Sequence, residues 1–131
     1  MIAALGVIPV EAYMGADLVC VLKDEAQVRQ AVPNQELIRS MDGVCFHITA
    51  QGSDYDCVTR TFAPKCGVAE DPVCGRGHCH VILLWAGKTG KRELTAYQAS
   101  ARSGILHCRY AGERTFLSGT AALFSEAEIY F

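Results

Sequence analysis

Positive charge and aromatic side chains are scarce in this sequence. Its 131 residues include 12 Lys and Arg against 14 Asp and Glu, a net charge of −2, and only 8% of the residues are aromatic. No stripe of basic residues runs along any segment. Nucleic-acid and anionic membrane surfaces are bound mainly through clustered Lys and Arg. The composition therefore predicts no nucleic-acid partner.

Long hydrophobic runs are also missing. The apolar opening has no positively charged segment before it and is interrupted by Gly6 and Pro9. The most apolar run, residues 81–86, is much shorter than the roughly 20 residues that span a bilayer. We therefore predict no secretory signal, no membrane contact and a cytoplasmic location.

The cysteine pattern lacks the features of a disulfide or zinc framework. The seven cysteines are an odd number, and no CxxC pair occurs. Cys66, Cys74, His78, Cys79 and His80 supply zinc-ligand types, but consecutive residues of a helix point in different directions. We therefore predict no metal and no disulfide in a reducing compartment, with Cys20, Cys45 and Cys79 buried.

The hydrophobic pattern predicts one α+β domain over residues 1–131, with no linker or repeat. Asp24 and Asn34 have the residue types and spacing of helix N-caps. The predicted helices cover 25–32, 35–41 and 78–86, and the predicted strands cover 7–13, 17–22, 44–50, 55–62, 93–98, 104–110, 114–117 and 121–129.

The helix at residues 78–86 is apolar on every side, which is typical of an enclosed helix rather than a surface one. We expect it to begin near Arg76 or Gly77 and to end between residues 86 and 88. Leu83 and Trp85 should then be largely buried. The expected fold is a mostly antiparallel sheet rolled around this one central helix.

The stretch EDPVCGRGHCH before this helix has several interpretations. The amides at a helix N-terminus can bind an anion, and Gly75 and Gly77 would let it approach closely. We expect Asp71, Gly75 and Arg76 to lie together at an open, solvent-facing mouth, with the amides of residues 75–77 available to an anion. Asp71 could then act as an acid or base. Cys74 could be a nucleophile whose pKa the helix lowers. Alternatively, the acids only cap backbone amides and the glycines only make a turn. No GxSxG is present to support a serine hydrolase.

The sequence as a whole resembles the second half of the phenazine-biosynthesis (PhzF-like) isomerase family. The resemblance is carried by ALGV, PVE, VPN, ITAQG, VTRTFAPKCGVAEDPVCGRGHCHVILLWA, LTAYQASARSGILHCR and FLSGTA. That family has the diaminopimelate epimerase fold, in which two similar halves each roll a sheet around a central helix. The resemblance implies that this chain is one such half, with its active site facing the cleft between halves.

The resemblance also assigns roles. Asp71 matches the family's active-site aspartate in the signature E-D-P-V-[TC]-G-S-A-H, and Gly75 matches the glycine whose amide lines the cleft. Arg76 replaces a serine that contacts substrate, Gly77 replaces an alanine, and His78 matches a histidine. In the later motif Q-x-S-x-R-G-G, four positions match and Ser103 replaces a glycine; the matches are Gln98, Ser100, Arg102 and Gly104.

The family's principal acid/base is a glutamate in the first half, which this sequence does not contain. The resemblance therefore implies one of two functions. The chain is either a cofactor-independent isomerase of a small carboxylate whose cleft another chain completes, or an inactive half-domain that acts as a binding or interaction module. Because a lone half exposes apolar surface, we expect a homodimer or pairing with a complementary half.

Overall fold

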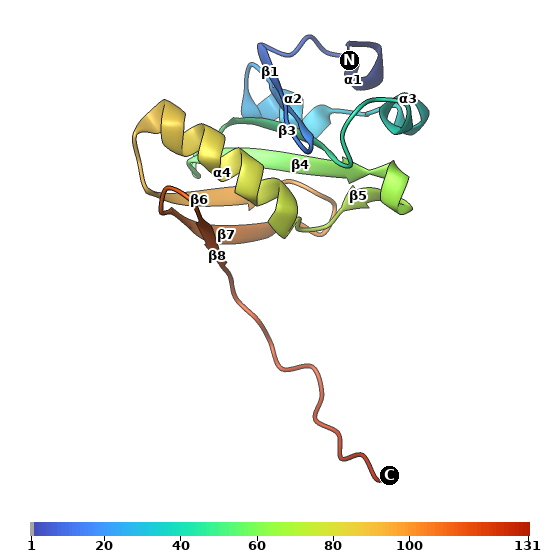
Figure 1. The fold of residues 1–131 in the computed structure, drawn as a ribbon, viewed down its shortest axis with the longest axis vertical. Helices are drawn as coiled ribbons and strands as arrows, with labels where there is room; N and C mark the ends of the chain where they lie inside the picture. The colour runs from blue at the N-terminus through green and yellow to red at the C-terminus, as the bar shows by residue number, and fades with distance from the viewer. Residues whose placement is uncertain (1) are drawn as a thin grey trace.

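The computed structural model describes residues 2–131 and consists of one eight-stranded sheet with helices on both faces (Figure 1). The strands are β1 (Glu11–Met14), β2 (Leu18–Val21), β3 (Phe46–Gln51), β4 (Cys57–Ala63), β5 (Val68–Asp71), β6 (Glu93–Gln98), β7 (Gly104–Tyr110) and β8 (Thr115–Ser118). The helices are α1 (Ile2–Leu5), α2 (Glu25–Gln30), α3 (Gln35–Arg39), a 3₁₀ turn at Pro64–Cys66, and α4 (Gly75–Thr89).

The sheet has the order β1-β2-β3-β4-β6-β7-β8, and β5 pairs with β4 off this path. Only the β2–β3 and β4–β6 pairs are parallel. The expected mostly antiparallel α+β fold is therefore confirmed, although the sheet remains open. β5 was not predicted from the sequence, because its four residues have an acidic end that is also typical of a turn.

Two hydrophobic clusters lie on opposite faces of the sheet. The first joins α1, α2 and α3 to β2, β3 and β4 through residues such as Val28, Ile38 and Phe62. The second packs α4 against β2, β4, β6 and β7 and is centred on Trp85, Val81 and Ile82. Strand residues alternate between the two clusters, as the two-residue period of a strand requires.

The predicted central helix is present, and its start and end agree within a turn. Trp85 is buried as predicted, but Leu83 is 51% exposed and Cys79 is also exposed, so both burial predictions are wrong. The physical reason is that the open sheet covers only one side of α4, which leaves its other side facing solvent. In residues 2–131 no disulfide joins any pair of cysteines.

The predicted strands at residues 7–13 and 121–129 differ from the structure. The first is shorter and begins at Glu11. The second does not form: residues 119–131 leave β8 as an extended chain that projects away from the body of the fold (Figure 1). This segment has no strand beside it in the described chain to which its amides could bond. In the described residues, no helix is both long and apolar enough to cross a bilayer.

Candidate functional site

A three-residue loop, residues 72–74, joins the acidic end of β5 to the start of α4. Asp71 is the last residue of β5, and Cys74 is the N-cap of α4. An Asx turn holds the loop, because Asp71 Oδ1 accepts the N–H of Val73 at 3.0 Å. The Sγ of Cys74 accepts the N–H of Gly77 at 3.2 Å. Side chains of the loop thus accept hydrogen bonds from the amides of the loop and of the first helical turn.

Two polar residues, Gln98 at the end of β6 and Ser100 just after it, fix this loop from the side. The buried amide of Gln98 accepts the N–H of Cys74 at 2.9 Å and donates to the carbonyl of Asp71 at 2.6 Å. Ser100 Oγ donates to the carbonyl of Pro72 at 2.6 Å. These matches to the family's later motif therefore hold the loop at both ends, a role that the sequence alone did not indicate.

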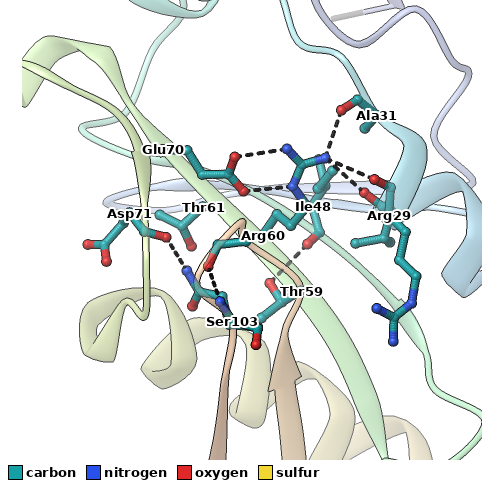
Figure 2. Close-up of polar contacts among 12 residues, drawn as sticks. Arg29, Ala31, Ile48, Thr59, Arg60, Thr61, Glu70, Asp71 and Ser103 are labelled. Atoms are coloured by element: carbon teal, nitrogen blue, oxygen red, sulfur yellow. Dashed lines mark hydrogen bonds and ion pairs between the residues drawn. The ribbon is translucent and has the colours of Figure 1, made fainter.

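Glu70 and Asp71 point to opposite sides of β5 (Figure 2). Glu70 forms a two-pronged ion pair with Arg60 at 2.7 and 2.9 Å. The remaining prong of Arg60 donates to carbonyls at the end of α2, including that of Ala31 at 2.7 Å. The ion pair with Arg60 holds Glu70 on the side of β5 that faces α2. Asp71, the next residue of the strand, therefore points away from α2 and lies beside Thr61 of β4.

Asp71 and the first residues of α4 form the accessible part of the site. Gly75 and Arg76 are exposed, and Asp71 is half-buried. Among residues 2–131, no hydrogen bond engages the N–H of Gly75 or of Arg76. A helix N-terminus with unbonded amides attracts anions, because the positive end of the helix dipole and the free N–H donors face the same point in space.

Gly77 and His78, predicted to face the ligand, are buried instead. The N–H of Gly77 is already bonded to Cys74, so the expectation of three free amides is wrong by one. A Cβ on Gly77 would lie 2.8 Å from the ring of His47 and from Thr61 Oγ1. The ring of His78 is fully buried with Nδ1 2.7 Å from the carbonyl of Cys74. Both residues therefore pack under the helix start.

A second polar cluster, which sequence reasoning missed, surrounds Asp17. The carboxylate of Asp17 is fully buried and accepts two bonds from Arg76, at 2.6 and 3.0 Å. It also accepts the N–H of Cys45 at 3.1 Å, and the rings of His47 and His80 lie 3.3 and 3.2 Å away. Arg76 was expected at the mouth, but its guanidinium is turned to Asp17.

The electrostatics of the Asp17 cluster follow from its bonds. Burial acts to raise the pKa of Asp17, but the bonds from Arg76, Cys45 and His47 outweigh it and hold that pKa well below the ordinary range. Burial lowers the pKa of His47 despite the nearby Asp17. His47 Nδ1 lies 2.9 Å from Thr61 Oγ1. Apart from Arg76 itself, no sequence pattern indicates this cluster, because its members lie on four separate segments.

Cys74 does not have the properties of an activated nucleophile. Its side chain is buried, and burial raises the pKa of its thiol even though the amide of Gly77 acts in the opposite direction. In the described part of the chain, no three His, Cys, Asp or Glu side chains converge as a metal site would need. The accessible polar groups at the start of α4 thus include the carboxylate of Asp71 and the two amides.

Fold and site together define an α+β protein whose open sheet packs against a helix with two unbonded amides at its start. Comparison with known proteins gives the family: the profile of the phenazine biosynthesis-like (PhzC-PhzF) family matches residues 4–127. The chain belongs to this family.

Individual relatives agree with that assignment. An uncharacterised isomerase of Pseudomonas aeruginosa is 41% identical over 96% of this chain and 49% of its own length. A PhzF-family crystal structure from Enterococcus faecalis superposes with a TM-score of 0.92 and 43% identity over 99% of this chain and 50% of its own. A PhzC/PhzF structure from Clostridium difficile gives 0.86 and 38%, covering 96% of this chain and 49% of its own. The chain thus spans about half the length of the relatives it matches.

Proposed function

We propose that this chain supplies one wall of the active site of a cofactor-independent isomerase that moves a proton on a small carboxylate. The observation that supports this most directly is the position of Asp71 beside two unbonded amides, those of Gly75 and Arg76. The substrate carboxylate would accept hydrogen bonds from both amides, and Asp71 would donate or remove the proton that moves in the isomerisation. The Pseudomonas aeruginosa relative carries the name isomerase, which agrees with this chemistry.

Proton-transfer isomerisation needs one group that removes a proton and another that returns one. Asp71 is one such group, so we propose that the second comes from the facing half of the cleft. A second copy of this chain or a complementary half-domain would provide that wall. The small negative charge of the chain and its reduced cysteines favour a cytoplasmic enzyme without a nucleic-acid partner.

A non-catalytic binding module is the second candidate, and Arg76 favours it. The guanidinium stands where the family has a substrate-contacting serine, and it is bonded to Asp17 rather than directed to the mouth. In that case the two amides would still bind an anion, but no proton would move.

The experiment separates binding from chemistry. A panel of small carboxylates is tested in D₂O, and NMR follows both binding and the incorporation of deuterium at the carbon next to the carboxylate. We expect Asp71→Asn to keep binding and abolish incorporation, Gly75→Ala to weaken binding, and the exposed-loop control Asp54→Asn to change neither. Binding without any incorporation by the wild type would favour the module, and the absence of both would refute the proposal.

A further inference from the structure

The proposed reaction leaves the buried thiol of Cys74 without a role, although this thiol lies between the start of α4 and Asp71. Its Sγ accepts the N–H of Gly77 at 3.2 Å, and its side chain also interacts with Asp71 and Thr61. A thiol is a weak acceptor and a weak donor at the same time. The S–H of Cys74 therefore remains available to an oxygen of Asp71 or of Thr61.

The thiol of Cys74 keeps its proton at neutral pH. Burial raises the pKa of the thiol above the ordinary 9.0, and the charge of Asp71 and a hydrogen bond to Asp71 act in the same direction. The amide of Gly77 and the hydroxyl of Thr61 act in the opposite direction without reversing the shift. Because the thiol stays protonated, Cys74 can be a hydrogen-bond donor to one of its two oxygen neighbours.

The hydroxyl proton of Thr61 has a direction that follows from the buried residues behind it. Asp17, whose pKa lies well below the ordinary range, is ionised and can only accept. The Nε2 of His47, 3.3 Å from Asp17 Oδ2, therefore carries a proton. Burial lowers the pKa of His47, so the ring is neutral and its Nδ1 is an acceptor. Nδ1 lies 2.9 Å from Thr61 Oγ1 and thus accepts the hydroxyl proton of Thr61.

Thr61 consequently has no proton to donate to Asp71, although the two residues are neighbours. They pair across β4 and β5 and lie side by side in Figure 2. The carboxylate of Asp71 accepts the N–H of Val73 through Oδ1 at 3.0 Å. A carboxylate has about four lone-pair sites. A second donor from the loop can therefore bind Asp71 and still leave lone pairs for a ligand.

Two acceptors thus compete for the S–H of Cys74: the neutral hydroxyl oxygen of Thr61 and the carboxylate of Asp71. Hydrogen bonds to ionised acceptors are roughly twice as strong as those between neutral groups. The buried amide of Gln98 also holds Asp71 and Cys74 at a fixed spacing, because it bonds to the carbonyl of the first and to the N–H of the second. Charge and geometry both favour the carboxylate.

We propose that Cys74 is a positioning residue, which donates its S–H to the carboxylate of Asp71. Together with the amide of Val73, the thiol would turn the remaining lone pairs of Asp71 toward the mouth. Asp17, His47 and Thr61 support this arrangement from behind, because they direct the proton of Thr61 away from Asp71. The consequence for proton transfer rests on the proposed function of Asp71, whereas the hydrogen bond itself does not.

Infrared spectroscopy tests the hydrogen bond without any substrate. The S–H stretch lies in a window free of other protein bands, and difference spectra against Cys74→Ala isolate the band of Cys74. We expect this band to move to higher frequency in Asp71→Asn, because an amide is a weaker acceptor than a carboxylate. The band should stay in place in Thr61→Val and in the exposed-loop control Asp54→Asn. Nitrogen-15 NMR should show the ring of His47 protonated at Nε2.

Deuterium incorporation into the small carboxylates tests the consequence for the reaction. Cys74→Ala should lower the rate of incorporation about tenfold, as the loss of one hydrogen bond does, and leave carboxylate binding within about twofold of the wild type. Cys74→Ser supplies an O–H donor and should restore the rate. Asn34→Ala is the matched control, because it removes the N-cap side chain of α3 as Cys74→Ala removes that of α4. It should leave the rate unchanged.

The outcomes separate this inference from the proposed function. A Cys74 band that ignores Asp71→Asn, or that moves in Thr61→Val instead, would overturn the hydrogen bond. Equal rates of incorporation in Cys74→Ala and the wild type would overturn the positioning role. A wild type that incorporates no deuterium would refute the proposed function and the positioning role with it, while the infrared band would still decide whether the thiol donates to Asp71.

Discussion

Two aspartates on either side of the start of α4 have opposite environments. Asp17 is fully buried, and its oxygens bond to Arg76 and to the amide of Cys45, with two histidines in contact. Asp71 is half-buried, and among the described residues its side chain accepts one backbone amide. The difference teaches that Asp17 stabilises the fold because its bonds are internal, whereas Asp71 is partly exposed and interacts with the amide of Val73 and the thiol of Cys74 within its own loop.

The largest expected effect is the loss of Asp17. Asp17→Asn keeps the volume but removes the charge that Arg76 and the buried His47 face. Breaking such a buried network lowers the free energy of unfolding by about 3 kcal/mol. Urea unfolding measures this loss. Asp71→Asn is the matched control and should stay within about 0.5 kcal/mol of the wild type. Equal losses in the two variants would remove the distinction between the aspartates.

The two glycines of α4 sharpen the same contrast. A Cβ at Gly77 would meet His47 and Thr61 at 2.8 Å, whereas a Cβ at Gly75 would meet only Leu117, at 3.7 Å. Gly77→Ala should therefore cost about 2 kcal/mol through overpacking of the Asp17 cluster. Gly75→Ala should cost less than about 0.5 kcal/mol, because Ala also favours a helix. Thermal and urea unfolding of both variants check this, and a stable Gly77→Ala protein would contradict the packing shown.

Acidification should weaken the fold through the buried histidines. Burial lowers the pKa of His47 and of His78 below the ordinary 6.5, so the unfolded chain binds more protons as the pH falls below that value. Stability is therefore complete above pH 6.5 and decreases below it, by at most about 1.4 kcal/mol per pH unit for each histidine. Unfolding midpoints between pH 7.5 and 5.5 measure the slope. A His47→Gln variant should flatten it, and a slope unchanged by that variant would exclude His47 as its source.

The depressed pKa of Asp17 predicts a second loss at lower pH. A carboxyl whose folded pKa lies below the ordinary 3.8 stabilises the fold above that value, and the contribution disappears as the pH falls through the folded pKa. This second step should be missing in Asp17→Asn.

The smallest effect is expected at the cap of α4. Cys74→Ser replaces a thiol acceptor by a hydroxyl that caps helices at least as well, so stability should change by less than about 0.5 kcal/mol. Cys74→Ala removes the acceptor and should cost about 1 kcal/mol. Thermal unfolding of both variants is the measurement. A serine variant as unstable as the alanine variant would mean that the size of the sulfur, rather than its bond to Gly77, matters.

Much of the fold could be predicted from the sequence. Asp24 and Asn34 cap α2 and α3 as predicted, since each side chain accepts the third following amide. α4 starts after its turn and contains the predicted buried Trp85. These features depend on residues close together in the chain, so their pattern is visible in one segment. Asp71, Gly75 and Arg76 were also expected beside this helix start, and the structure places them there.

The exposure of Leu83, the burial of Gly77 and His78, and the orientation of Arg76 could not be predicted. Each depends on a partner far away in the sequence: Arg76 bonds to a residue 59 positions earlier, and Leu83 depends on how far the sheet closes around α4.

The sequence by itself determined the family, the strand and helix patterns and the acidic turn before α4, because local propensity and motif spacing fix them. Only the tertiary structure decided that Asp17 is the buried partner of Arg76 and that two helix amides remain unbonded rather than three. Within residues 2–131, it also decided that residues 119–131 and the outer edge of β1 have no neighbouring strand. The physical reason is that burial and bonding of polar groups depend on which distant segments the sheet brings together, and an open sheet edge exists only once all the strands are in place.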